Sequence, residues 1–386
     1  MVGAMTDETG GEAADTQAKA EAKPEAKPDA KTGGGLRGVL AKLALMLGSF
    51  LVVVLLLEGG FRLAGYGPST HLRWFAHPDL HYTAAPNQRG EVQVADKKAG
   101  EASVQIAINA HGQRGEDYPL EKPVGEVRIV ALGDSLTFGP GVGNEQTYLA
   151  VAQQAFRDDP PGKGTLRLVN TAANGYSTWH YQQWVRTQLD TYDPDVLLLC
   201  LYIGNDMTIS TKHRMFNPVP FPRLVRNSAI GHYLLENNRP LLTRLYKSWY
   251  DDPDGTLEPI APELQRFVNV PEDDLGFDDK MALWRHALTH IAAMKEAADA
   301  AGVPLLCLLI PQSHMVSQEG DFPLYTWLAR TLDGQGIAVL DPREALRPLG
   351  MDGWHSYDPG HFNVAGHAAL GRYLADALRA RGFGEP

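Results

Sequence analysis

"VRIVALGDSLTFGPGVGNEQTY", residues 127–148, passes from an apolar run rich in β-branched residues into a glycine-rich turn and then into a helix-like segment. The run predicts a buried strand over Val127–Leu132, and the glycines predict a sharp turn where the strand ends. Ser135 lies at that turn. A small polar residue there either caps the turn or acts as a nucleophile at the carboxyl edge of a sheet, and the rest of the chain has to decide.

The same apolar pattern recurs downstream, with helix candidates between most of the strands. The further strand candidates are 166–169, 196–202, 304–310 and 338–340, and the helix candidates are 146–157, 178–189, 279–301, 323–333 and 364–381. Near-continuous apolar strands that alternate with helices are typical of a parallel sheet covered on both faces. The sequence therefore predicts an α/β fold with its active site at the carboxyl ends of the strands.

Composition excludes several classes of function. The chain has 386 residues, enough for one large or two ordinary domains, and a formal net charge of −11. An acidic surface repels phosphate backbones, so we expect no nucleic-acid partner. The only two cysteines, Cys200 and Cys307, each lie in an apolar run. They are interpreted as buried free thiols, which argues against a disulfide framework and a cysteine metal site.

The first 60 residues differ from the rest. A repeated Ala-Lys-Pro-acidic unit predicts a disordered cytoplasmic tail over 1–35. The stretch Val39–Leu57 then carries a single charge, Lys42, and is about one bilayer span long. We expect an uncleaved transmembrane anchor over 38–60. A cleaved signal peptide and a buried core helix are the rival interpretations, but the leader is long and no clear cleavage site comes after it.

The charges that flank this anchor predict its orientation. Basic residues are more numerous before and at the start of the apolar stretch than after it: Lys27, Lys31, Arg37 and Lys42 against Arg62 and Arg73. The positive-inside rule places the side richer in lysine and arginine in the cytoplasm. The sequence therefore predicts a single-pass inner-membrane protein with a cytoplasmic N-terminus. Everything after residue 62 would lie outside, which is the periplasm of a Gram-negative cell.

The soluble part divides into two regions by pattern. Residues 61–125 predict a lead-in region with short strands, and residues 126–386 predict the main domain. The main domain contains an insert, 207–278, that is rich in aromatic residues, Pro and Asn. It is too long for a plain loop in a compact domain. We interpret it as a lid beside the active edge, with an inert elaboration or a partner surface as the alternative.

Further polar groups come after the second and third strands. Gly175 in "NGYST" could present its backbone N–H, which no side chain shields, to the same point as Ser135. Asn205 in "GND" can donate a side-chain N–H to an oxyanion. Asp206 beside it is interpreted as a turn or helix cap. When each is considered alone, Gly175 and Asn205 are more often ordinary turn residues.

Histidines and aspartates gather in "DGWHSYDPGHFNVAGHAALG", residues 352–371, just before the last helix candidate. A general base needs an imidazole that a carboxylate holds in one tautomer. Asp358 and His361 supply both within one turn. Asp352 and His355 have the same spacing and are the rival pair. His367 falls inside the helix and is interpreted as a packing or surface residue.

Together these four blocks resemble the SGNH (GDSL-type) hydrolase family, in the order "GDSLTFG", "NGYST", "GND" and "DPGHFNVAGH", over most of residues 126–386. The resemblance implies a flavodoxin-like three-layer α/β/α sandwich with a central parallel sheet of about five strands. It also implies acyl-ester hydrolysis or transfer. The resemblance implies that Ser135 is the nucleophile, that His361 is the general base, and that Asp358 orients the His361 imidazole. The oxyanion hole would combine the N–H groups of Ser135 and Gly175 with the Asn205 side chain.

Two further comparisons sharpen the resemblance. The residues after His361 match the last block of the family better than the residues after His355. The lead-in stretch "INAHGQRGEDYPLEKP", 108–123, is similar to that of membrane-anchored bacterial members. The G-x-S-x-G elbow of α/β-hydrolases is absent around Ser135, which argues against that other serine-hydrolase fold.

The sequence as a whole predicts a membrane-anchored, extracytoplasmic serine esterase. Its substrates would be acetyl or short-chain acyl esters of envelope polysaccharide or lipid, and the chemistry needs no metal ion or cofactor. An O-acyltransferase that uses the same residues is the first alternative. The second is a non-catalytic envelope binding or scaffold protein, which the four intact blocks disfavour.

Overall fold

The computed structural model describes residues 36–64, 72, 74–77, 79–93, 103–160, 164–209, 228–231, 233, 261–267, 270–356 and 358–383. The chain divides into two compact units, residues 1–59 and 60–386. The predicted tail, 1–35, lies outside the described residues, as does most of the predicted lid, 207–278.

Helix α1 (Leu36–Leu63) is 28 residues long and contains the predicted anchor. Its most apolar window has a mean hydropathy of 2.6, so it is long and apolar enough to cross a membrane. Ser49 donates its hydroxyl to the carbonyl oxygen of Leu45 one turn earlier. This bond satisfies the hydroxyl inside the helix, as a bilayer requires. Insertion and orientation in a membrane stay predictions.

The main sheet has five parallel strands in the order β6-β5-β7-β8-β9. The strands are β5 (Glu126–Gly133), β6 (Thr165–Asn170), β7 (Val196–Tyr202), β8 (Leu305–Ile310) and β9 (Ala338–Leu340). This order is the flavodoxin-like one, and it reverses direction between β5 and β7. The predicted fold class is confirmed. The crevice that such folds use for ligands lies at the carboxyl ends of β5 and β7.

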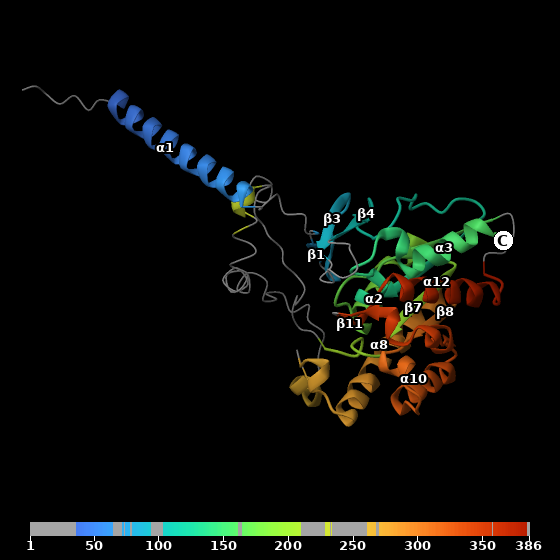
Figure 1. Cartoon of the computed structure of the whole chain (residues 1–386). Coiled ribbons are helices and arrows are strands. Elements are labelled where there is room, and N and C mark those ends of the chain that lie inside the picture. Colours follow the sequence, from blue (N-terminus) through green and yellow to red (C-terminus); the bar gives the residue numbers. More distant parts are fainter. Residues whose placement is uncertain are drawn as a thin grey trace, which may run out of the picture. The chain divides into compact units, whose positions relative to one another are not determined.

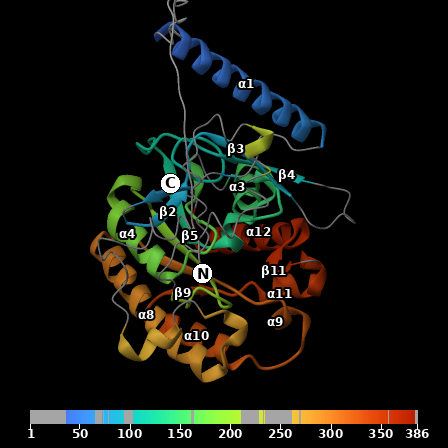
Figure 2. The same cartoon turned by 90° about the vertical axis from the view of Figure 1, so that its left-hand side faces the viewer.

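Helices cover both faces of this sheet (Figure 1). One face carries α3 (Tyr148–Asp158) and α12 (Val364–Arg379), and the other carries α4 (Thr178–Tyr192), α8 (Phe277–Ala300) and α10 (Pro323–Gly334). On the second face α4 and α8 lie side by side (Figure 2). On the first face, the close packing of α12 against α3 requires glycine at position 371, because a Cβ there would lie 2.6 Å from the Val151 Cβ of α3.

The strands are apolar throughout because alternate residues enter two different cores. Ile129 and Ala131 of β5 pack with α3 and α12, whereas Val130 and Leu132 pack with α4, α8 and α10. All four are at most 1% exposed. Cys200 and Cys307 are buried free thiols, as predicted.

Short elements connect the longer helices and strands. They are α2 (Ser135–Phe138), η2 (Asn144–Gln146), η3 (Pro262–Phe267), η4 (Glu272–Asp274), α9 (His314–Ser317), α11 (Arg343–Leu346), η5 (Arg347–Gly353), β10 (Trp354–His355) and β11 (Asp358–Phe362). Strands β10 and β11 pair antiparallel immediately before α12. This pair carries the histidines and aspartates of the last sequence block.

The lead-in region forms two antiparallel hairpins. Strand β1 (Trp74–His77) pairs with β2 (His81–Ala84), and β3 (Gln88–Gln93) pairs with β4 (Ser103–Ile108). Ile106 and Ile108 of β4 share a small core with Phe138 and Ala172. These two partners lie after β5 and after β6, respectively. The lead-in hairpins therefore pack on the edge of the sheet where the candidate site lies.

Candidate active site

A serine, a histidine and an aspartate form a hydrogen-bonded chain at the carboxyl end of β5. Ser135 is the first residue of α2, directly after the strand. Its Oγ lies 2.7 Å from Nε2 of His361. The other ring nitrogen of His361, Nδ1, lies 2.6 Å from Oδ2 of Asp358. An imidazole that donates to a carboxylate through Nδ1 has Nε2 available to accept the serine proton. The geometry thus brings together the three residues that the sequence named.

The position of His361 depends on how the last block folds. Asn363 begins α12, and its Oδ1 accepts hydrogen bonds from the N–H groups of Ala365 and Gly366. Its Nδ2 donates to the carbonyl oxygens of Asp352 and Trp354. One side chain therefore caps the helix and fastens the β10–β11 pair against it. This arrangement positions His361, on β11, so that its imidazole contacts Ser135.

Asp352 and His355, the rival pair with the same spacing, occupy other positions in this block. His355 is half-buried in β10, and Asp352 is exposed in η5 before it. The imidazole that contacts Ser135 Oγ belongs to His361. The geometry therefore favours Asp358 and His361 over Asp352 and His355.

His367 is a packing residue, which is one of the two interpretations of its helical position. It is 1% exposed, and its Nδ1 accepts a hydrogen bond of 3.2 Å from the N–H of Tyr148 in α3. Burial, with the charge of Arg114 as a secondary cause, lowers the pKa of His367 from 6.5 to about 3. The side chain is therefore neutral in the folded protein at neutral pH.

This shift makes His367 a source of acid lability. The unfolded chain binds the proton first as the pH falls, so stability is lost from pH 6.5 down toward pH 3. At pH 4 the cost is about 3 kcal/mol. We expect His367→Asn, which keeps an acceptor for the Tyr148 N–H, to be less stable at pH 7 and to lose less stability on acidification. Urea unfolding in detergent micelles at pH 7, 5.5 and 4 measures this; an equal loss of stability in both proteins would contradict it.

Asp134 is a second carboxylate at the site, and the sequence reasoning did not assign it a role. It caps α2 by accepting a 2.9 Å hydrogen bond from the N–H of Leu136, and its Oδ2 lies 3.4 Å from Ser135 Oγ. Burial raises the pKa of Asp134 to about 6, although the Leu136 N–H and the neighbouring His361 lower it. The sequence feature that could have indicated a role for Asp134 is its position between a buried strand and Ser135.

The loops after β6 and β7 are joined to this edge by backbone hydrogen bonds. The N–H of Ala173 donates to the carbonyl oxygen of Gly133, two residues before Ser135, and the N–H of Thr178 donates to that of Asp206. Gly175 has a φ of +80°, which glycine adopts readily and other residues rarely do. The three loops that carry the predicted oxyanion donors therefore meet at one edge of the sheet.

The loop after β7 is rigid around Asn205. Asp206 is fully buried, and it accepts hydrogen bonds from the Tyr202 N–H and the Tyr181 hydroxyl, so it is a structural cap as interpreted from the sequence. A Cβ on Gly204 would lie 2.4 Å from the Tyr202 ring, which makes glycine necessary there. Asn205 itself is half-buried, and its Oδ1 has no hydrogen-bond partner among the described residues.

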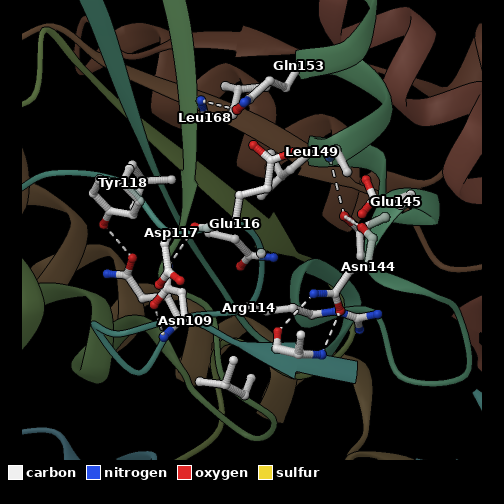
Figure 3. A pocket seen from close by; sticks show the side chains of 18 of the residues that line it. Asn109, Arg114, Glu116, Asp117, Tyr118, Asn144, Glu145, Leu149, Gln153 and Leu168 are labelled. Carbon is white, nitrogen blue, oxygen red and sulfur yellow. Dashed lines mark hydrogen bonds between the residues drawn. The ribbon is translucent and has the colours of Figure 1, made fainter. Parts of the chain in front are cut away.

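Arg114 of the lead-in region holds the loop that comes after Ser135. Its guanidinium donates to the carbonyl oxygens of Phe138, Gly139 and Val142. Its Nε donates to Asn144 Oδ1 at 3.1 Å (Figure 3). Burial lowers the pKa of Arg114 to about 9, which leaves it cationic at neutral pH. Arg114, a residue from outside the main sheet, thus holds the glycine-rich loop after Ser135 in place.

A pocket of about 730 Å³ lies on the lead-in side of this contact, between the segment 113–118, the β3–β4 hairpin and α3 (Figure 3). Ser135, His361 and Asp358 are not among its lining residues. The pocket is therefore separate from the candidate active site.

Comparison with known proteins gave matches among solved structures alone. No family model matches the chain, and neither does any curated protein. A putative lipolytic protein of the G-D-S-L family from Desulfitobacterium hafniense DCB-2 is 15% identical over 65% of this chain and 99% of its own, with a TM-score of 0.37. TesA is 14% identical over 66% of this chain and 98% of its own, with a TM-score of 0.38.

An acetylxylan esterase, Axe2 from Geobacillus stearothermophilus, is 14% identical over 67% of this chain and 94% of its own, with a TM-score of 0.35. The solved structures to which the chain is similar include a putative lipolytic protein of the G-D-S-L family and an acetylxylan esterase.

Proposed function

We propose that this chain is a serine esterase that α1 anchors in the membrane and whose active site lies outside the cytoplasm. The observation that carries the proposal is the continuous path from the Asp358 carboxylate through both nitrogens of His361 to Ser135 Oγ, with distances of 2.6 and 2.7 Å. Serine is a weak nucleophile until a base removes its proton, and this path supplies the base together with the group that orients it.

The reaction proceeds in two halves. Nε2 of His361 takes the Ser135 proton as Oγ attacks the ester carbonyl, and the resulting imidazolium returns that proton to the departing alcohol when the C–O bond breaks. Water then attacks the acyl-serine with the same base, and the acid is released. Asp358 stays ionised and stabilises the imidazolium through Nδ1–H.

Three donors would stabilise the tetrahedral oxyanion: the backbone N–H groups of Ser135 and Gly175 and the side-chain amide of Asn205. They lie after β5, β6 and β7, and β5 pairs with both of the other strands. The proposal is supported by the backbone bonds that join these loops and by the rigid setting of Asn205. Removal of one such donor typically costs about 3 kcal/mol of transition-state stabilisation.

The three residues of the proposed triad differ in exposure. The side chain of His361 is 24% exposed and that of Asp358 is 43% exposed, whereas Ser135 is 8% exposed and buried. A membrane anchor would confine the enzyme to esters carried by envelope lipids and polysaccharides. We therefore propose acetyl or short-chain acyl esters of these molecules as substrates.

Covalent labelling tests the proposal directly. The full-length chain in detergent micelles is incubated with a fluorophosphonate while p-nitrophenyl acetate hydrolysis is monitored, and the labelled peptide is identified by mass spectrometry. We expect one label per chain, on Ser135, with activity lost in proportion. A label on another serine, or a labelled chain that still hydrolyses ester, would refute the proposal. A single burst of p-nitrophenol that turns over only when a sugar alcohol is added would identify an O-acyltransferase instead.

A further inference from the structure

A tyrosine of the lead-in region contacts the same peptide unit that carries a proposed oxyanion donor. Tyr82, in β2, donates its hydroxyl to the carbonyl oxygen of Asn174 at 2.6 Å. That carbonyl and the N–H of Gly175 belong to one peptide group. We propose that Tyr82 is a positioning residue that orients and polarises this peptide, so that the Gly175 N–H is aimed at the oxyanion. This inference rests on the proposed esterase function.

The geometry of the peptide bond links the two ends of the group. A trans peptide is planar, and its C=O and N–H point in opposite directions. A bond that fixes the direction of the Asn174 oxygen therefore fixes the direction of the Gly175 N–H. Donation to the carbonyl also polarises the amide, which strengthens its N–H as a donor by about 10–30%.

Gly175 needs such an external constraint. Gly175 has a φ of +80°. Because glycine adopts positive and negative φ values about equally readily, local sterics alone do not select one orientation of the Asn174–Gly175 peptide group. The hydrogen bond from Tyr82 makes that selection. The bond spans 92 residues of sequence, so the lead-in region adds a constraint to the hydrogen bond that closes the turn within the loop, from the Tyr176 N–H to the carbonyl oxygen of Ala173.

Tyr82 is itself held rigidly for this task. Its own carbonyl oxygen accepts a hydrogen bond of 2.5 Å from the Tyr176 hydroxyl, so the residues on both sides of Gly175 are tied to it. Its ring packs on Trp74 and Tyr176, with centroids 5.8 and 5.3 Å away, and it is 4% exposed. Burial raises the pKa of Tyr82 well above 10, which keeps the hydroxyl protonated as a donor.

The test is Tyr82→Phe, which removes only the hydroxyl, in the full-length chain in detergent micelles. We expect kcat for p-nitrophenyl acetate to fall about 10- to 30-fold with KM within about twofold, because one of three donors is misaimed and not deleted. Tyr325→Phe is the matched control. Its hydroxyl is also buried, and it lies 2.9 Å from the carbonyl oxygen of Leu309 in β8 and 2.8 Å from Oδ1 of Asp341. We expect this control to keep kcat within about twofold.

A thionoester separates positioning from general damage. Sulfur is a weak hydrogen-bond acceptor, so a thionoester gains less from the oxyanion donors. Loss of positioning lowers ester hydrolysis more than p-nitrophenyl thionoacetate hydrolysis, and the ratio of the two kcat/KM values should fall about fivefold or more in Tyr82→Phe. A structural defect lowers both rates equally and leaves the ratio unchanged.

The outcomes distinguish this inference from the function on which it rests. If Ser135 takes up the fluorophosphonate but Tyr82→Phe keeps the wild-type kcat or the wild-type ester-to-thionoester ratio, the positioning role is overturned and the esterase stands. If the wild-type chain neither reacts at Ser135 nor hydrolyses ester, the proposed function fails first and the inference fails with it.

Discussion

Replacing either Ser135 or His361 with alanine is expected to lower kcat for p-nitrophenyl acetate by roughly 10⁴- to 10⁶-fold, and the double variant should lose no more than either single one. The reason is that Oγ and Nε2, 2.7 Å apart, act as one unit: a serine without its base and a base without its serine are equally inactive. Release of p-nitrophenol under saturating substrate measures kcat for the four proteins, and KM should change little.

His355→Ala is the control for this experiment. His355 lies on β10, which pairs with β11, the strand that carries His361. We expect His355→Ala to keep kcat within about fivefold, because the imidazole bonded to Ser135 is that of His361. A larger loss of kcat in His355→Ala than in His361→Ala would identify His355 as the general base and Asp352 as its orienting carboxylate, and would contradict the assignment.

The fold was predictable from the sequence because its strands are buried on both faces. Such strands are apolar at every position, as in Val196–Tyr202, and a short run of this kind between turn residues is typical of a strand in a parallel sheet. Helix ends were less certain. Helix α3 begins at Tyr148 and not at residue 146, because the Thr147 hydroxyl accepts the hydrogen bond from the Ala150 N–H that caps it.

The candidate site was predictable where its residues come directly after strands, and not where they arrive from elsewhere. The end of β5 is a local feature of the sequence, so Ser135 could be named from its surroundings. The contacts of Arg114 with Phe138 and of Tyr82 with Asn174 join residues 24 and 92 positions apart. No periodicity or spacing encodes such pairs, because they depend on where the lead-in hairpins pack.

Asp358→Asn is expected to lower kcat by roughly 10²- to 10⁴-fold with little change in KM. The carboxylate orients the ring through Nδ1 and stabilises the imidazolium, and a neutral amide does neither as well. The Gly360 N–H, 3.2 Å from Oδ1, donates to the carboxylate and helps to hold it in place. Because the side chain is 43% exposed, water replaces part of the lost interaction, and we expect the lower half of that range.

The matched control is Asp352→Asn, the same substitution at the exposed aspartate of the rival pair, which should stay within about twofold of wild type. A kcat above half the wild-type value in Asp358→Asn would contradict the role of this carboxylate. It would then point to Asp134, a second carboxylate whose pKa the charge of His361 lowers. Asp134→Asn in the Asp358→Asn background would test that alternative, since two carboxylates that share one role show their full effect only when both are removed.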